Sequence, residues 1–280
     1  MILMASNSSL SVGELFAGSM GPGIILGLLY AGYVALVAII RPDLAPPVPT
    51  DDKVSRGTLL RMLVMEALPP LVLIFGILGT MLAGIATATE ASAIGAALAL
   101  GIVIFRGRFE WATFRSAVYE TARTSAMILF IVVGATAFTG VFNITGGLRA
   151  AQELMRSLDM APWMLIAVMM FIVFLLGMFL DWTGIVLLSF PIFLPIVQEM
   201  GVNELWFVVL TAVVLQTSFL SPPFGYALFY LRALAPKEVR TSDIIIGVLP
   251  FIGLILMMAM AIALFPQLVT WLPATLYGPK

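Results

Sequence analysis

The sequence contains no cysteine and no histidine. Their absence excludes disulfides, thiolate zinc sites, cysteine nucleophiles, imidazole bases and haem ligands. The groups that remain for chemistry are carboxylates, hydroxyls, amides and backbone carbonyls, which are hard oxygen ligands suited to small cations such as Na⁺. Because no set of nucleophile, base and orienting group is visible, we expect neither an enzyme nor a bound cofactor.

Charge of either sign is scarce, with 14 basic and 15 acidic residues in 280 and a net charge of -1. Nucleic acid is therefore not an expected partner. Hydrophobic residues make up 61 % and charged residues 10 %, against roughly 45–50 % and 25 % in soluble domains. Mean hydropathy is +1.11. This composition excludes a water-soluble fold and predicts an all-α polytopic protein that contacts membrane lipid.

Apolar segments of the length of a membrane crossing recur along the chain, since a helix needs about 20 such residues to span. The candidates are 20–40, 59–81, 87–105, 124–142, 162–180, 185–197, 205–231 and 244–265. We expect about six transmembrane helices, a helical hairpin with arms 162–180 and 185–197, and a broken helix. The arm 185–197 is too short to span unaided. In the first segment, Gly23-x-x-x-Gly27 either admits a closely packed helix or reflects the glycine content of membrane helices.

Most of the basic residues fall in three stretches, which the positive-inside rule places in the cytoplasm. They are Arg41, Lys53, Arg56 and Arg61; Arg106, Arg108, Arg115 and Arg123; and Arg232, Lys237 and Arg240. Both termini are then expected outside. We expect one membrane domain over 1–280, with a first crossing and stiff linker (42–49) in 1–58. A helix pair and an interfacial helix follow in 59–123, and the hairpin, broken helix and final crossing in 124–280. In 105–123, a solvated helix packed on the bundle is the alternative to the interfacial helix.

A single carboxylate interrupts a long apolar stretch. Between 160 and 198 the only charged residue is Asp181, in Gly177-Met-Phe-Leu-Asp181-Trp-Thr183-Gly184. A lone carboxylate at bilayer depth costs several kcal/mol unless it is paired, protonated or hydrated, so Asp181 is a candidate site. Because no Lys or Arg marks a cytoplasmic connection here, we expect a re-entrant hairpin that turns at the tetrapeptide Asp181–Gly184. The alternative is that Asp181 caps the second arm through the N–H groups of Thr183 or Gly184, and the two roles are compatible.

The second polar interruption is the nine-residue run TSFLSPPFG at 217–225. Pro222 and Pro223 donate no backbone hydrogen bond, so the carbonyls of Ser218 and Phe219 lose their helical partners. Freed carbonyls beside three hydroxyls form an oxygen-rich cluster of the kind that discontinuous helices build in secondary transporters. The alternative is a proline kink healed by a hydroxyl. The candidate residues of this segment are Thr217, Ser218, Ser221, Pro222, Pro223 and Gly225.

Two further polar interruptions lie earlier in the chain. Thr87-x-x-Glu90 fits a capping box at a helix start, and the alternative is that Thr87, Thr89 and Glu90 face a polar cavity. Asn143, with Thr145, Gly146 and Gly147 shortly after it, indicates an exit turn.

In this order, the interruptions resemble those of the large membrane subunit of tripartite ATP-independent periplasmic (TRAP) transporters. The segments that carry the resemblance are Thr87-Ala-Thr89-Glu90 (the family's TPTE), Gly177-Met-Phe-Leu-Asp181 followed by Pro191-Ile-Phe-Leu-Pro195, Leu220-Ser-Pro-Pro-Phe-Gly225 (its LTPPxG) and 15–23 (its LFxAGxxPG). Ala88 replaces the family's proline, and Ser221 replaces its threonine but keeps a hydroxyl.

The resemblance implies an elevator-type secondary transporter of the bacterial inner membrane, built from two inverted repeats of which this chain matches the later one. It implies import of an organic acid anion, coupling to Na⁺, and three partners: a periplasmic binding protein, a small membrane subunit and the missing N-terminal half. A non-transporting remnant or scaffold, and a channel, are the alternatives. The expected substrate and ion site comprises Asp181, Thr183, Gly184, Thr217, Ser218, Ser221, Pro222, Pro223 and Gly225, with Na⁺ at Asp181, Ser218 and Ser221; a second group is Thr87, Thr89, Glu90 and Asn143.

Overall fold

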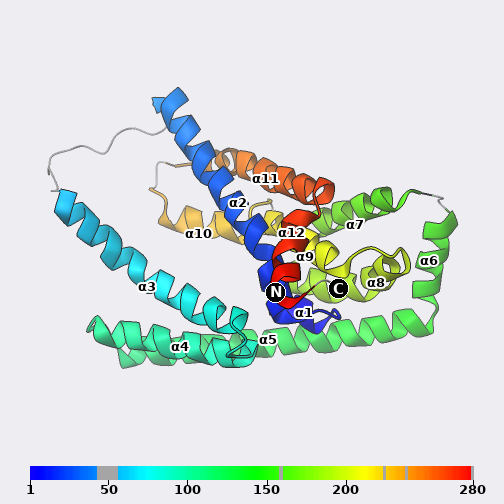
Figure 1. The fold of residues 1–280 in the computed structure, drawn as a ribbon, viewed down its shortest axis with the longest axis horizontal. Coiled ribbons are helices and arrows are strands. Elements are labelled where there is room, and N and C mark those ends of the chain that lie inside the picture. Colours follow the sequence, from blue (N-terminus) through cyan, green and yellow to red (C-terminus); the bar gives the residue numbers. More distant parts are fainter. Residues whose placement is uncertain (43–55, 158–159, 223–224, 237–238, 279–280) are drawn as a thin grey trace. The chain divides into compact units, whose positions relative to one another are not determined.

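The computed structural model describes residues 1–42, 56–157, 160–222, 225–236 and 239–278, and the regular elements in these ranges are all helices (Figure 1). They are α1 (Ile2–Ser6), α2 (Val12–Ile40), α3 (Arg56–Leu82), α4 (Ala88–Phe105), α5 (Trp111–Ile144), α6 (Gly147–Ser157), α7 (Pro162–Gly177), α8 (Trp182–Glu199), α9 (Glu204–Leu215), the 3₁₀ helix η2 (Gln216–Phe219), α10 (Tyr226–Leu234), α11 (Thr241–Leu264) and α12 (Gln267–Tyr277). The predicted all-α polytopic fold is confirmed. The expected linker at 42–49 lies outside the described residues, apart from Pro42.

Among the described helices, six are long and apolar enough to cross a membrane. They are Val12–Ile40, Leu60–Leu82, Ala88–Phe105, Trp111–Ile144, Trp182–Glu199 and Thr241–Leu264. The second arm of the hairpin was expected to be the shorter one, and this is wrong. It forms α8, which has 18 residues, whereas the first arm forms α7, which has 16. The Asp181 cap starts α8 three residues before the expected arm, and the helix continues to Glu199. That the hairpin is re-entrant stays a prediction.

The stretch expected as a separate interfacial helix is part of a longer element. Helix α5 runs without interruption for 34 residues, so the helix does not end between Arg123 and Thr124. The sequence contains no proline in α5 and no glycine before Gly134, so nothing local ends the helix at the arginines. The turn expected at Asn143 is confirmed, because α5 ends at Ile144 and Gly146 adopts a φ of 81° before α6 begins.

The structure divides into two compact units, which are described separately. The first comprises Met1–Tyr30 and Ser125–Lys280, and the second comprises Ala31–Thr124. The single membrane domain stays a prediction.

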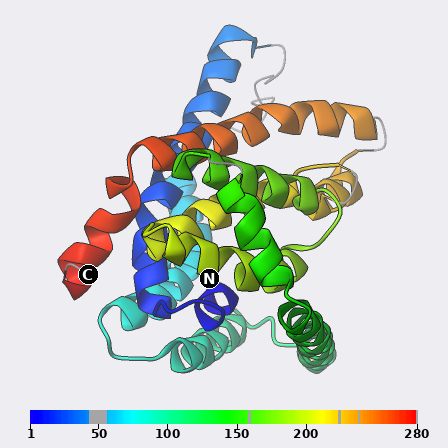
Figure 2. The ribbon, with the colours of Figure 1, turned by 90° about the vertical axis from the view of Figure 1, so that its right-hand side faces the viewer.

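The core of the first unit surrounds α9, which contacts α7, α8, α11 and α12 (Figures 1 and 2). A helix that is apolar on all sides must be buried on all sides, and nine of the 12 residues of α9 are buried. Phe207 and Val208 are fully enclosed, and the Trp206 indole Nε1–H donates to the Ile262 carbonyl at 2.8 Å. This hydrogen bond satisfies the one polar atom of a buried indole and fixes α9 against α11.

The close contacts of α2 involve glycines other than Gly23 and Gly27. A Cβ added at Gly21 would lie 2.9 Å from the Leu268 carbonyl oxygen, and one at Gly18 would lie 3.3 Å from Val269 of α12. An added Cβ at Gly23 or Gly27 meets no atom of the described residues within 4 Å. Close packing on α2 therefore uses the Gly18 and Gly21 face.

The second unit is centred on the antiparallel pair α3 and α4, which lie side by side (Figure 1). Each helix presents a glycine to an aliphatic side chain of the other. Gly95 of α4 lies against Ile77, whose Cδ1 is 2.6 Å from the position of an added Cβ, and Gly76 of α3 lies against Leu98. These two contacts hold the C-terminal half of α3 closely against α4.

Glu204 ties the start of α9 to the N-terminal segment of the chain. Its carboxylate accepts hydrogen bonds from the Ser9 N–H at 2.9 Å, the Ser9 hydroxyl at 2.6 Å and the Gln198 amide at 3.2 Å. Partial burial opposes ionisation, but the hydrogen bonds from Ser9 and Gln198 outweigh it, so the pKa of Glu204 lies below its ordinary value. The ionised carboxylate is thus the form that the fold stabilises.

We predict that Glu204→Gln lowers the free energy of unfolding by about 1 kcal/mol at pH 7, less than the roughly 1.5–3 kcal/mol of a buried charged hydrogen bond. A depressed pKa contributes stability above the pKa of the unfolded chain and loses it as the pH falls through the folded-state pKa. The difference between the two proteins should therefore shrink below the ordinary value of 4.5. Thermal unfolding in detergent from pH 7 to pH 3 measures it. Exposed Glu153→Gln is the matched control, and a pH-independent difference contradicts the prediction.

Candidate functional site

The hairpin tip is built by the sequence between α7 and α8. Helix α7 ends at Gly177, and Asp181 is the N-cap of α8. The Asp181 carboxylate accepts hydrogen bonds from the N–H groups of Thr183 at 3.1 Å and Gly184 at 3.4 Å. Thr183 is buried, whereas Asp181 and Gly184 are half-buried. The capping role of Asp181 is therefore present in the structure, and a charged site role is compatible with it because only part of the carboxylate is used.

The break expected after α9 is confirmed. The α-helical geometry of α9 ends at Leu215, and the chain continues as the 3₁₀ helix η2. The next α-helix, α10, starts only at Tyr226. The Thr217 carbonyl accepts hydrogen bonds from the Ser221 N–H at 2.8 Å and the Leu220 N–H at 3.0 Å. The Thr217 hydroxyl donates to the Val214 carbonyl at 2.6 Å. Thr217 thus closes the broken end of the helix with its own backbone and side chain.

Backbone oxygens converge where the break ends. A Cβ added at Gly225 would lie 3.0 Å from the carbonyl oxygen of Phe219 and 3.0 Å from that of Ser221. A side chain at this position would have to displace the neighbouring backbone slightly, so glycine allows the closest approach here. Pro222 lies in the turn, and Pro223 lies outside the described residues.

The end of α7 lies closely against the break at Gly177. Gly177, the last residue of α7, lies directly against Ser218 of η2, so an added Cβ would overlap the Ser218 hydroxyl and lie 3.2 Å from its Cβ. The Ser218 side chain is 6 % exposed, and its hydroxyl has no hydrogen-bond partner among the described residues. A buried hydroxyl without a partner is costly, and this one lies at the junction of the two predicted features.

The structure brings some predicted site residues together and leaves others apart. Thr217, Ser218, Ser221 and Gly225 share the break, and all three hydroxyl residues are buried. Within the described part of the chain, no hydrogen bond or ion pair joins Asp181 to the break. The hairpin as a whole does contact it, because α7 packs against η2 and α8 packs against α9.

The second group of candidates does not lie in this unit, apart from Asn143. Thr87 and Glu90 form the capping box of α4, in which the Thr87 N–H and hydroxyl each donate to Glu90 Oε2 at 2.8 Å. Thr87, Thr89 and Glu90 are exposed in the second unit, and Asn143 is exposed in the last turn of α5. Their role in a binding site stays a prediction.

The donor set at the break suits a hard monovalent cation better than a transition metal. Within the described ranges, no group of three His, Cys, Asp or Glu side chains lies close enough to hold a metal ion. Hydroxyl and carbonyl oxygens are instead concentrated at the break, and the Ser218 hydroxyl is free to coordinate. These oxygen groups are of the kind that Na⁺ prefers, and Na⁺ binding by Asp181, Ser218 and Ser221 stays a prediction.

Sequence reasoning missed Ser189 of α8. Its hydroxyl is buried and has no partner among the described residues, and the residue lines a cavity of about 370 Å³ with Phe138 and Ile172. The available signal was that Ser189 is the only hydroxyl residue in 185–197. A larger cavity, of about 680 Å³, is lined from 9–14, 203–205 and 267–278 and contains none of the predicted site residues.

We predict that Gly177→Ala destabilises the protein by about 1–3 kcal/mol, because the added methyl forces Ser218 and its hydroxyl out of place. Ser218→Gly in the same chain should recover most of this loss, which a double-mutant cycle of thermal unfolding measures. Gly23→Ala is the control, since its added Cβ meets no described atom within 4 Å. If Gly177→Ala lowers the free energy of unfolding equally in the wild-type and the Ser218→Gly backgrounds, the contact is refuted.

Comparison with known proteins gives one consistent family. Residues 1–268 match the model of the tripartite ATP-independent periplasmic transporter, DctM component. The chain is 26 % identical over 274 residues to the C4-dicarboxylate TRAP transporter large permease protein DctM of Pseudomonas aeruginosa, covering 98 % of this chain and 62 % of that protein. It is 31 % identical over 286 residues to the ectoine/5-hydroxyectoine TRAP transporter large permease protein UehC of Ruegeria pomeroyi, covering 97 % and 62 %.

A third relative is the 2,3-diketo-L-gulonate TRAP transporter large permease protein YiaN of Escherichia coli, 25 % identical over 272 residues that cover 96 % of this chain and 61 % of that protein. The chain thus spans about 62 % of the length of the relatives it matches. All three are named as permeases rather than enzymes, which agrees with the expectation from composition. The family match extends across both units and includes the hairpin and the break, and this chain belongs to the DctM family of tripartite ATP-independent periplasmic transporters.

Proposed function

We propose that the chain is part of the large membrane subunit of a secondary transporter that imports an organic acid anion. In this proposal, Na⁺ is the coupling ion, a periplasmic binding protein delivers the substrate, and a small membrane subunit and an N-terminal half complete the assembly. The hairpin and the broken helix carry the ion and substrate region and travel together. The family membership supports the transporter class, whereas the ion, the substrate and the partners are part of the proposal.

The observation that carries the proposal is the junction of Gly177 with Ser218. A proline kink that only bends a helix uses its hydroxyls to heal the freed carbonyls. Here the Thr217 hydroxyl donates to the Val214 carbonyl rather than to the carbonyl of Ser218 or Phe219, and the Ser218 hydroxyl is buried without a partner among the described residues. A buried hydroxyl without a hydrogen-bond partner, in a segment where the carbonyls of Phe219 and Ser221 also come together at Gly225, supplies oxygen groups of the kind that a dehydrated cation requires.

The direct contact of α7 with η2 supports movement of the hairpin and the break as one body. Gly177 allows the helix end to touch η2, and close-packed contacts of this kind transmit displacement rather than absorb it. A substrate anion bound near Na⁺ at this junction would be displaced with it. This arrangement favours a carrier over a channel, in which the site stays fixed.

The substrate class is proposed from chemistry as well as from the relatives. A bound cation beside helix N-termini, such as that of α8 at Asp181, is a favourable environment for a carboxylate. The relatives are named for a C4-dicarboxylate, for ectoine and for 2,3-diketo-L-gulonate, so the family's named substrates differ. We propose an organic acid anion for this chain without choosing among them.

The test is Na⁺-dependent uptake by the complete transporter carrying Asp181→Asn together with Ser221→Ala. We expect the Na⁺ concentration for half-maximal uptake to rise at least about tenfold, in line with the roughly 10–100-fold cost of disturbing a metal site. Uptake of a candidate acid into proteoliposomes, with the binding protein and with or without a sodium gradient, measures it.

Single variants separate the two roles of Asp181, because Asn caps a helix about as well as Asp but carries no charge. If Asp181→Asn alone leaves the Na⁺ dependence unchanged, Asp181 is only a cap. Thr136→Ala is the matched control, since it removes an exposed hydroxyl that donates to the Val132 carbonyl of its own helix. Unchanged uptake and Na⁺ dependence in the double variant would remove these residues from the site, and absence of uptake in the unaltered transporter would favour a non-transporting remnant.

A further inference from the structure

The first half of α3 has little to hold it against its neighbour. From Gly57 to Leu68, nearly every described side chain is exposed, whereas the glycine contacts with α4 involve Gly76 and Ile77. Pro69 and Pro70 separate these two halves. The contacts that secure the second half therefore do not reach the first.

The double proline also breaks the hydrogen-bond ladder of α3. In an α-helix the N–H of residue 69 donates to the carbonyl of residue 65, but proline has no N–H to donate. The Met65 carbonyl is consequently left without its helical partner. At the depth of a membrane helix, such a carbonyl needs a donor from within the protein.

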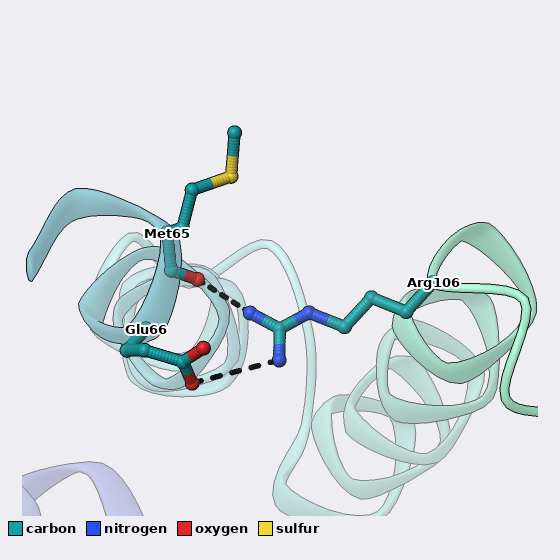
Figure 3. Close-up of polar contacts among 3 residues, drawn as sticks. All are labelled: Met65, Glu66 and Arg106. Atoms are coloured by element: carbon teal, nitrogen blue, oxygen red, sulfur yellow. Dashed lines mark hydrogen bonds and ion pairs between the residues drawn. The ribbon is translucent and has the colours of Figure 1, made fainter. Parts of the chain in front are cut away.

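Arg106, the C-cap residue of α4, supplies that donor (Figure 3). Its Nη2 donates directly to the Met65 carbonyl oxygen, and its Nη1 lies 3.7 Å from Glu66 Oε2. The Glu66 side chain is 78 % exposed, and an ion pair so open to its surroundings contributes little. The bond to the carbonyl, which restores a specific lost partner, is therefore the stronger constraint.

We propose that Arg106 is a surrogate backbone donor that repairs α3 at Pro69 and pins the first half of this helix to the end of α4. The guanidinium suits this position because its donors are arranged in a planar fork, so that one reaches the carbonyl while another faces the carboxylate. Glu66 orients the guanidinium. With this pin, the two halves of α3 and the end of α4 form one rigid hairpin across a double proline that would otherwise act as a hinge.

The test measures how readily the first half of α3 separates from α4, in the purified membrane complex that contains this chain. We expect Arg106→Ala to raise the amide hydrogen-exchange rate in 60–68 about tenfold, the ratio that corresponds to loss of one charge-assisted hydrogen bond. The matched control is Arg108→Ala, which removes an exposed arginine two residues away and should leave the rate unchanged.

The decisive comparison replaces the proline. In Pro69→Ala the new N–H donates to the Met65 carbonyl, so adding Arg106→Ala should raise exchange less than threefold. Pro70→Ala restores a donor for the Glu66 carbonyl only. In the Pro70→Ala background, Arg106→Ala should therefore still raise the exchange rate in 60–68 about tenfold. An equal effect of Arg106→Ala in the wild-type and Pro69→Ala backgrounds overturns the proposal.

A second variant keeps the proposal testable if Pro69→Ala does not assemble. Glu66→Gln neutralises the ion pair but leaves the Met65 carbonyl and Arg106 in place. We expect less than a threefold rise in exchange over 60–68. A tenfold rise would show that the ion pair rather than the carbonyl bond holds the helices together, and would overturn the assignment.

Discussion

A backbone that leaves helical geometry inside a membrane must find partners for its freed N–H and C=O groups within the protein, because lipid offers none. The described chain leaves α-helical geometry at the hairpin tip and at the break after α9, and in α3 the double proline removes two backbone donors from a continuous helix, which makes it a third interruption of the hydrogen-bond ladder. Each interruption has its own substitute partner: the Asp181 carboxylate, the Arg106 guanidinium and the Thr217 carbonyl. In each case a polar group lies where the hydrogen bonding of a helix is incomplete.

The three interruptions differ in which polar groups are present besides the substitute hydrogen bonds. At the hairpin tip and at the double proline, a charged side chain reaches the freed backbone groups. At the break after α9, Thr217 closes the helix end, yet the Ser218 hydroxyl and the carbonyls near Gly225 add further oxygens. A buried hydroxyl without a partner is unfavourable in a dry interior, and at these three interruptions Ser218 is the described side chain in that position. That an ion or a substrate supplies its partner stays a proposal.

Features controlled by nearby residues were predictable from the sequence, and features controlled by packing were not. Proline placed the break, and the Thr87-x-x-Glu90 box placed the start of α4, because both act within a few residues. The contact of Gly177 with Ser218 and the bond from Arg106 to Met65 join residues 41 apart in each case. Sequence spacing does not say which helices are neighbours, so it left two alternatives for Gly23 and Gly27; the described residues show no close packing there, whereas Gly18 and Gly21 do pack closely.

Close packing of helices at glycines and hydrogen bonding of polar groups left by incomplete helices depend on each other in this structure. Gly177 brings α7 onto η2, and the contacts of Gly76 and Gly95 bring α3 onto α4, within the reach of Arg106. A larger residue at such a position would do more than overpack, because it would also separate a freed backbone group or a hydroxyl from its partner. The small residues are thus a condition for the hydrogen bonds. Since a chain with 10 % charged residues has few alternative donors, each of these glycines restricts which conformations the incomplete helices can adopt.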